Sequence, residues 1–172
     1  MKNSGCYQLF VGCESGDDEI LKSTGKGITT QQIADCFKLC KKVGMATYGY
    51  FVIGLPHETV DTILKTIDFA IKLNPASVQF TIAMPFPATD LYKSVEENGL
   101  FLKDMDYGSF KWYGHPVFCE NVKPSELIRL QRLAYSKFYY RPSFIIKQLF
   151  SIRSSADIKR LFNGLLMLRN FT

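Results

Sequence analysis

The sequence predicts an α/β fold in which three parallel strands alternate with helices, followed by a C-terminal helical segment. Two observations lead to this fold class. Three short runs of apolar, β-branched or aromatic residues are each followed by a segment with helical periodicity, and such a series forms parallel strands joined by right-handed crossovers. Along the first and third strands, polar or small residues alternate with apolar ones, which favours a barrel with a polar lumen over a flat sheet.

The first unit consists of a strand over residues 7–13 and a helix over 30–43. The strand is apolar and aromatic, and turn-forming residues follow it. The helix begins with the capping-box pair Thr29 and Gln32 and ends at Gly44, the residue type preferred just past a helix.

The later elements follow from the same signals. They are, in chain order, a strand over 46–53, a helix from Thr59 to the stop at Asn74-Pro75, a strand over 77–84, a short helix from Thr89 to Gly99, an irregular aromatic stretch over 100–123, and helices over 125–140, beyond Pro142 and over 155–169. We therefore expect a barrel-like unit over 1–99 and a helical extension over 100–172.

Composition excludes several classes of protein. Of the 172 residues 47% are hydrophobic, which excludes intrinsic disorder. No run of eighteen uncharged apolar residues is present, so a membrane-spanning helix is not expected. The first residues lack the layout of a signal peptide, so we expect a cytoplasmic protein. The five cysteines are accordingly expected to be thiols.

Charge is distributed unevenly along the chain. Residues 1–122 carry 11 basic and 14 acidic side chains, a net charge of −3, whereas residues 123–172 carry 10 and 2, a net charge of +8. The formal charge of +5 therefore arises from the C-terminal segment alone. No base-reading motif accompanies it, so nucleic acid is not an expected partner.

Three segments resemble cofactor-binding or metal-binding motifs but lack residues that those motifs require. Cys36 and Cys40 have the spacing that opens a CxxxCxxC cluster motif, but Val43 occupies the third position. The segment Gly25-Lys26-Gly27 lacks the spacing and the hydroxyl of a phosphate-binding loop. His57 and His115 have no partners at metal-ligand spacing, so no metal site is expected.

Two strand ends allow both a structural and a functional interpretation. Glu14 follows the first strand and either caps the next turn or aims a carboxylate into a lumen, where it would accept hydrogen bonds from a ligand. Gly54, in the segment Gly54-Leu55-Pro56, either forms a tight turn or lets a flat ligand approach the backbone.

Taken together, these motifs resemble strands four, five and six of the partial barrel of radical S-adenosylmethionine enzymes. The resemblance rests on six segments and covers nearly the whole chain. They are Gly12-Cys13-Glu14-Ser15-Gly16, Lys26-Gly27-Ile28-Thr29, Gly49 to Thr59, Pro85 to Tyr92, Tyr113-Gly114-His115-Pro116 and Phe138 to Pro142. The last two are similar to the region after the barrel in the cobalamin-binding subclass, which includes magnesium-protoporphyrin monomethyl ester oxidative cyclases.

The resemblance implies cofactors that this chain would hold only in part. The family cleaves S-adenosylmethionine reductively with a [4Fe-4S] cluster to give a 5′-deoxyadenosyl radical, and cobalamin is implied for this subclass. The cluster loop and the cobalamin domain would belong to a missing N-terminal half, so the chain resembles the carboxyl half of a larger oxidoreductase or methyltransferase. The substrate and the reaction type stay open.

The resemblance also implies roles for individual residues. Glu14 and the adjacent Ser15 would contact the nucleoside or methionine part of S-adenosylmethionine, and Lys26 its carboxylate. The adenosine pocket would be lined by Tyr50, Val52 and Gly54, with Pro85 and Phe86 closing over adenine. Relatives often have a polar residue in place of Tyr50 and glycine in place of His57. No catalytic residue and no metal ligand are assigned.

Three further expectations follow. Without cluster ligands, the polypeptide alone is expected to be catalytically inert. A half barrel exposes an edge on its first strand, which would associate with another copy or be covered by the C-terminal helices. The alternative function is a non-catalytic module whose basic helical tail binds a partner or an anionic membrane surface.

Overall fold

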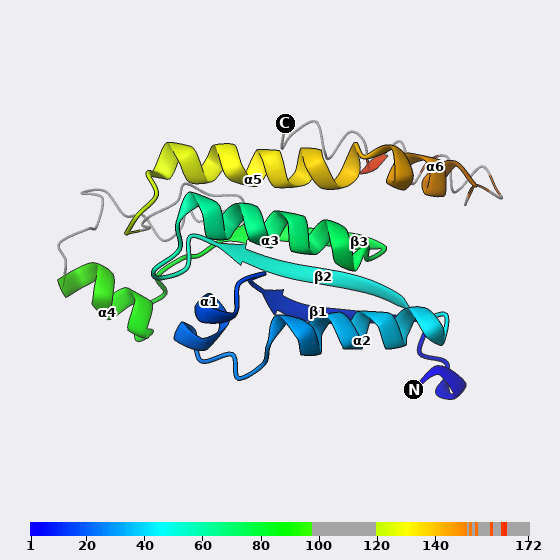
Figure 1. Ribbon diagram of the computed structural model, residues 1–172, viewed down its shortest axis with the longest axis horizontal. Helices are drawn as coiled ribbons and strands as arrows, with labels where there is room; N and C mark the ends of the chain where they lie inside the picture. The colour runs from blue at the N-terminus through cyan, green and yellow to red at the C-terminus, as the bar shows by residue number, and fades with distance from the viewer. Residues whose placement is uncertain (98–119, 151, 153, 155–158, 160–162, 165–172) are drawn as a thin grey trace.

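A parallel three-stranded sheet with the order β1-β2-β3 forms the centre of the computed structural model. The structure describes residues 1–97 and 120–150 and the single positions 152, 154, 159, 163 and 164. Its elements are the 3-10 helix η1 (Lys2–Ser4), β1 (Gln8–Glu14), α1 (Asp18–Ser23), α2 (Thr30–Lys42), β2 (Ala46–Ile53), α3 (Val60–Leu73), β3 (Ser77–Ile82), α4 (Asp90–Glu97), α5 (Pro124–Tyr139) and α6 (Pro142–Phe150). The predicted α/β class and the three parallel βα units are confirmed (Figure 1).

The helix termini follow the sequence signals. Thr29 and Gln32 form the predicted capping box of α2, and Thr59 forms one with Thr62 at the start of α3. Asn74 ends α3 in the left-handed conformation, with a φ of 50°. These local hydrogen bonds satisfy the backbone groups that each helix terminus leaves without a partner.

One helix was not predicted. The sequence indicated a turn after β1, but α1 follows it and is capped by Asp17, whose carboxylate accepts hydrogen bonds from the backbone N–H groups of Glu19 and Ile20. Ile20 and Leu21 are buried, so this single turn and a half of helix is held by tertiary contacts rather than by its own propensity. The expected helix over 155–169 and the motif at 113–116 lie largely or wholly outside the described residues.

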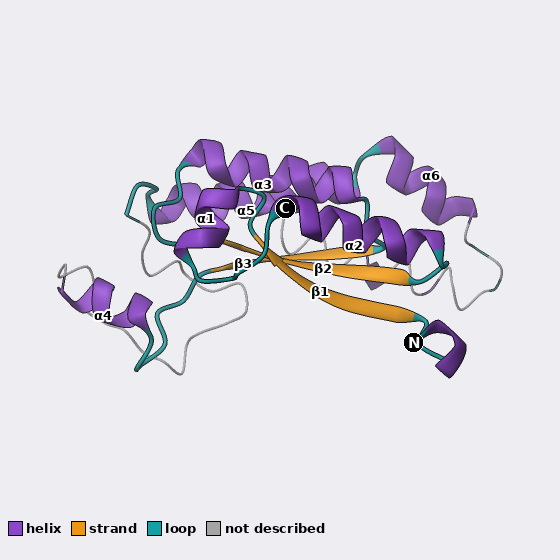
Figure 2. Ribbon diagram, turned by 60° about the horizontal axis from the view of Figure 1, so that its bottom comes forward, coloured by secondary structure: helices purple, strands orange, loops and turns teal. Residues whose placement is uncertain are grey.

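Within the described residues the helices cover one face of the sheet and leave the other open (Figure 2). The covered face carries the alternate strand residues Phe51, Ile53, Phe80 and Ile82, which pack against buried residues of α2, α3 and α5. Phe51 and Phe80 stack with ring centroids 5.2 Å apart. This alternation explains the burial pattern of β2 and β3, because successive side chains of a strand point to opposite faces.

The open face is more aromatic than the sequence suggested. Phe10, Tyr48 and Tyr50 form a cluster there, with centroid separations of 5.0 to 6.1 Å. Phe10 is 62% exposed. The polar or small lining predicted from the first and third strands holds for β3, whose Gln79 is the lateral neighbour of Tyr50. In β1, the exposed Phe10 departs from it.

The outer edge of β3 is covered by side chains of α5. The hydroxyl of Tyr135 accepts a hydrogen bond from the Phe80 N–H (3.1 Å) and donates one to the Phe80 carbonyl (3.2 Å). The hydroxyl of Tyr139 does the same for Val78, at 3.0 and 2.8 Å. The Gln131 amide donates to the Phe80 carbonyl at 2.8 Å. Residues 131, 135 and 139 are spaced by four and share one helix face, which follows the strand edge.

The two edges of the sheet therefore differ. In the described part of the chain β1 pairs with β2 alone. The edge of the first strand was expected to associate with another copy or to be covered by the C-terminal helices. Of these helices α5 covers the opposite edge, and the expected helix over 155–169 lies largely outside the described residues. No helix within the described residues is long and apolar enough to cross a membrane.

The covering of the β3 edge gives a first prediction. Tyr135→Phe removes the acceptor of the buried Phe80 N–H, so the free energy of unfolding should fall by about 1–3 kcal/mol. Tyr140→Phe is the matched control, because Tyr140 is the exposed residue that follows α5, and its effect should stay within about 0.5 kcal/mol. Urea unfolding monitored by circular dichroism measures both. Equal effects of the two substitutions would contradict a role for this hydroxyl.

Candidate functional site

The carboxyl ends of the three strands meet at one edge of the sheet, and β1 departs from regular pairing there. Its register with β2 shifts between Gly12 and Glu14. Glu14 has a φ of 59°, in the left-handed region that is uncommon for residues other than glycine. A Cβ on Gly12 would lie 2.7 Å from Glu14 Oε1, so the carboxylate lies above Gly12. Gly12 is the lateral neighbour of Tyr50, and the carboxylate is therefore on the open face.

Glu14 is paired with Lys26. The distance from Lys26 Nζ to Glu14 Oε1 is 2.8 Å, and the exposed fractions of the two side chains are 31% and 26%. Lys26 reaches this position because the chain turns back after α1, where the Lys26 N–H donates to the Leu21 carbonyl at 3.1 Å. Gly25 and Gly27 on either side have φ values of 67° and 69°, which permit the turn. The sequence assigned these two residues to one ligand but did not predict that they would pair.

Ser15 lies on the other side of the strand end. It is fully buried, its hydroxyl is 3.1 Å from the Thr66 hydroxyl of α3, and the Gly16 N–H donates to Thr66 at 2.9 Å. A Cβ on Gly16 would lie 2.7 to 3.0 Å from atoms of α3. Ser15 and Gly16 thus fix the β1–α1 turn to α3, and the Ser15 side chain does not reach the open face.

Glu58 holds the loop after β2. Its Oε2 accepts hydrogen bonds from the N–H groups of Gly54 (2.6 Å) and Leu55 (3.0 Å). The side chain is fully buried. Burial raises the pKa of Glu58 from 4.5 to about 7, the negative charge of Asp17 adds to the rise, and the two N–H groups oppose it. Glu58 lies within the segment Gly49 to Thr59, but no role was predicted for it from the sequence. The feature that could have indicated one is a carboxylate four residues after a glycine at a strand end.

The backbone conformation of Gly54 and its contact with α5 disfavour any side chain at this position. Its φ is 79°, and a Cβ would lie 3.1 Å from Leu127 of α5. The space that the missing side chain leaves is therefore filled by α5, and a ligand that approaches Gly54 would meet its backbone. Asn121 adds a second connection, because its amide donates to the Glu58 carbonyl at 3.2 Å.

Four other predicted residues lie at or near this edge. Tyr50 and Val52 are half-buried on the open face, in register with Gln79 and Thr81 of β3. Pro85 is buried just after β3, and Phe86 is 52% exposed. The predicted residues therefore fall into two groups. The side chains of Glu14, Lys26, Tyr50 and Val52 lie on the open face. The Ser15 side chain contacts α3, and Gly54 faces α5 on the side where a Cβ would be.

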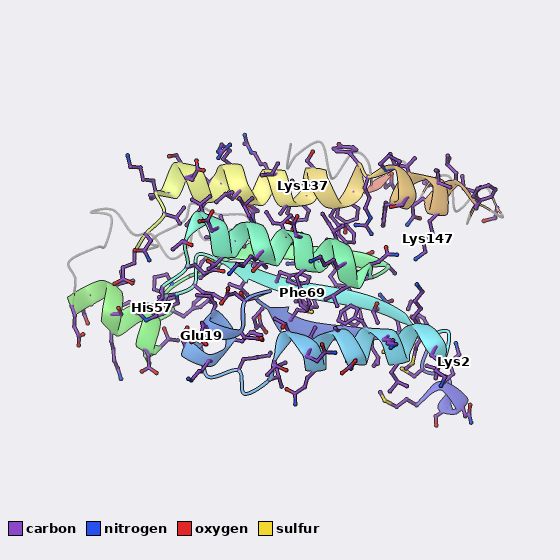
Figure 3. The ribbon with its side chains drawn as sticks, viewed as in Figure 1. Lys2, Glu19, His57, Phe69, Lys137 and Lys147 are labelled. Atoms are coloured by element: carbon purple, nitrogen blue, oxygen red, sulfur yellow. The ribbon has the colours of Figure 1, made fainter. Side chains whose placement is uncertain are left out.

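The cysteines and histidines form no metal site among the described residues. No group of three histidine, cysteine or carboxylate side chains is placed to hold an ion in that part of the chain. Cys36 and Cys40 lie on α2, and Cys40 is buried. His57 is exposed, 3.4 Å from Glu120 (Figure 3), with a φ of 64° that a glycine would adopt without strain. His115 and Cys119 lie outside the described residues.

A family model described as the radical SAM superfamily matches residues 1–70. This segment contains β1, α1, α2 and β2, and with them Glu14, Lys26 and the Gly54 loop. It therefore spans the part of the candidate site that the first two strands supply.

Several known proteins are similar over a longer part of the chain. An uncharacterized methyltransferase of Pyrococcus horikoshii is 39% identical over 166 residues, which are 96% of this chain and 36% of that protein. The anaerobic magnesium-protoporphyrin IX monomethyl ester cyclase of Rubrivivax gelatinosus is 23% identical over 84% of this chain and 25% of its own length. The chain thus spans about a third or less of these relatives.

One solved structure is also similar. It is the radical S-adenosylmethionine methyltransferase TsrM from Kitasatospora setae with cobalamin and a [4Fe-4S] cluster bound, at 22% identity and a TM-score of 0.49, covering 54% of this chain and 19% of that one.

The raised pKa of Glu58 predicts a pH-dependent stability. The folded protein keeps this proton at pH values where the unfolded chain has lost it, so the stabilisation is complete below about pH 4.5 and is lost as the pH rises through about 7. Glu58→Gln mimics the protonated carboxyl and removes this dependence. Relative to the variant, the wild type should lose on the order of 3 kcal/mol of unfolding free energy across this range.

Urea unfolding of both proteins at a series of pH values tests this prediction. The difference between the two free energies should fall steadily from pH 4.5 to 7.5. Parallel curves would mean that the pKa of Glu58 is the same in the folded and the unfolded protein, and a difference that grows with pH would mean that folding lowers this pKa.

Proposed function

Residues 1–70 of this chain belong to a radical SAM domain, and from this premise we propose that the open face at the carboxyl ends of β1, β2 and β3 forms part of an S-adenosylmethionine site in a longer radical SAM methyltransferase. The Glu14–Lys26 pair is the observation that carries the proposal. The name of the Pyrococcus horikoshii relative supports methyl transfer as the reaction class.

The ion pair matches the amino-acid end of the ligand. S-adenosylmethionine carries an α-ammonium and an α-carboxylate group, which are also a charge pair. The ligand carboxylate can take the place of Glu14 at the Lys26 ammonium, while Glu14 accepts hydrogen bonds from the ligand ammonium or a ribose hydroxyl. Both side chains are partly exposed, so they are accessible for this exchange with little rearrangement. If Glu14 binds the ligand ammonium, each charge keeps an opposite partner in both states.

The adenosine end has a surface of suitable chemistry next to the pair. Tyr50 lies beside Gly12 in the sheet, and Val52 lies one step further along the same face. The exposed ring of Phe86 follows β3 at the same edge. An aromatic and aliphatic surface with nearby backbone polar groups is typical of nucleoside pockets. The hydrogen bonds from Gly54 and Leu55 to Glu58 give the intervening loop a fixed backbone.

The residues do not fit an iron–sulfur cluster. Cysteine thiolates hold such clusters, and the 172 residues contain no CxxxCxxC motif. We infer that the cluster, and cobalamin where it is used, are held by other parts of the longer protein. Bound there, the cluster supplies the electron for reductive cleavage of S-adenosylmethionine. The open face and the outer edge of β1, which are uncovered among the residues that the structure describes, are the surfaces where the remainder of a barrel would join. Self-association stays a prediction.

Ligand binding tests the proposal directly. The 172-residue chain should bind S-adenosylhomocysteine, a stable molecule with the same amino-acid and adenosine groups, in equilibrium dialysis. Lys26→Met removes one charge-assisted hydrogen bond of about 1.5–3 kcal/mol and should weaken binding about tenfold or more. Lys65→Met is the matched control, because Lys65 forms an ion pair of 3.0 Å with Asp17 on the helix side.

Two outcomes would contradict the proposal. Equal losses in the two lysine variants would remove the specific role of Lys26. Absence of any binding by the folded wild type would favour the alternative, a non-catalytic module.

The cluster inference has its own test. After anaerobic reconstitution with iron and sulfide, the 172-residue chain should produce no 5′-deoxyadenosine above a protein-free control when S-adenosylmethionine and a strong reductant are added. Production above that background would show that the chain holds a competent cluster with residues outside the expected motif.

A further inference from the structure

In the part of the chain that the structure describes, the short helix α6 packs against α5 through Phe144. Phe144 meets Tyr139 at a centroid distance of 5.2 Å, edge to face, and Phe138 at 5.6 Å. Arg141 just before α6 donates to the Asn74 side chain and lies over the Phe138 ring, with the guanidinium 3.9 Å from its centroid. These contacts fix which side of α6 faces the core. They also make α6 a continuation of the outer layer that α5 begins (Figure 1).

The side of α6 that faces away from the core is apolar. Ile145, Ile146, Leu149 and Phe150 are 43%, 52%, 60% and 86% exposed. At about 100° per residue these four side chains occupy one half of the helix circumference, opposite Phe144. We call them the α6 stripe. A surface helix normally turns its apolar stripe toward the core, so this helix has the reverse orientation.

One basic side chain lies on α6 itself. Lys147 is exposed on this helix (Figure 3 labels it). The segment 123–172 has a net charge of +8, with only two acidic side chains. An apolar stripe combined with a large basic excess is the combination found in helices that lie in the interface of an anionic bilayer. A purely apolar protein partner would account for the stripe but not for the charge.

We propose that α6 is a membrane-docking helix that inserts the α6 stripe into the surface of an anionic bilayer, with Lys147 at the level of the lipid phosphates and the basic excess of the segment 123–172 adding to the attraction. The occupant of this surface is a lipid bilayer, and neither the cofactor site nor the radical chemistry is needed for the interaction. The cofactor edge of the sheet lies away from α6, toward the opposite end of the long axis (Figure 1).

Vesicle co-sedimentation tests this surface with the whole 172-residue chain. The chain should bind vesicles of phosphatidylcholine and phosphatidylglycerol in a ratio of about 7:3 and bind pure phosphatidylcholine vesicles at least about tenfold more weakly. Raising the salt to about 0.5 M should reduce binding to the anionic vesicles several-fold, because the charges are then screened within a few ångströms.

A pair of matched substitutions distinguishes binding through the α6 stripe from non-specific hydrophobic adsorption to the vesicles. Leu149→Ser should lower the affinity for anionic vesicles at least about fivefold. Leu39→Ser makes the same chemical change at a residue of α2 that is 61% exposed, against 60% for Leu149, and should leave binding unchanged. Circular dichroism of both variants checks that the fold is retained, and Lys147→Glu tests the charge without changing the apolar surface.

Three outcomes would overturn the proposal. They are failure of the folded wild type to bind anionic vesicles, equal loss of binding in the Leu39 and Leu149 variants, and a bound fraction that does not change with salt. Sedimentation velocity without lipid shows whether the chain forms a dimer through the α6 stripe. A dimer that Leu149→Ser dissociates, together with no vesicle binding, would assign the α6 stripe to a second copy of the chain instead.

Discussion

A parallel sheet of three strands cannot satisfy its own edges, and this constraint determines the arrangement of the rest of the molecule. Each outer strand leaves N–H and C=O groups without a strand partner. For β3 these groups are taken by Gln131, Tyr135 and Tyr139 of α5, whose side chains replace a missing neighbouring strand. With α5 held there, Leu127 packs under Gly54 and Asn121 reaches Glu58. The helix that covers the edge therefore also supports the loop after β2.

The same arrangement separates the groups that hold the backbone at the strand ends from the groups that lie on the open face. Ser15, Gly16 and Glu58 make buried hydrogen bonds toward the helices. Glu14 and Lys26 instead project on the open face, where they hold each other. These rigid connections on one side and the accessible charge pair on the other suit the proposed S-adenosylmethionine site, because the backbone would not need to move if a ligand replaced one member of the pair.

Most of the fold could be predicted from the sequence, because it is encoded in short-range patterns. The strands over 46–53 and 77–84 and the helix caps at Thr29 and Thr59 depend on residues within a few positions of one another, and the structure has them. The resemblance to radical S-adenosylmethionine enzymes and the choice of Glu14 and Lys26 rested on motifs of the same local kind. The family comparison agrees with the first of these.

What could not be predicted depends on geometry across long separations. The pairing of Glu14 with Lys26 requires the left-handed backbone of Glu14 and the turn through two glycines. The burial of Ser15 depends on Thr66, fifty-one residues away, and no periodicity distinguishes a serine that faces a lumen from one that faces a helix. Tyr135 and Tyr139 read as ordinary helix residues, since their hydroxyl groups find partners only when α5 lies along β3.

The sequence separation between β3 and α5, the helix that covers its outer edge, also affects the order of events during synthesis. Tyr135 and Tyr139 follow their partners Phe80 and Val78 by 55 and 61 residues. At a synthesis rate of about 5–20 residues per second, the third strand is complete roughly 3 to 12 seconds before the helix that seals it has been made. During that interval the outer edge of β3 lacks the hydrogen bonds that α5 supplies, so the nascent sheet is more exposed to aggregation until α5 has emerged.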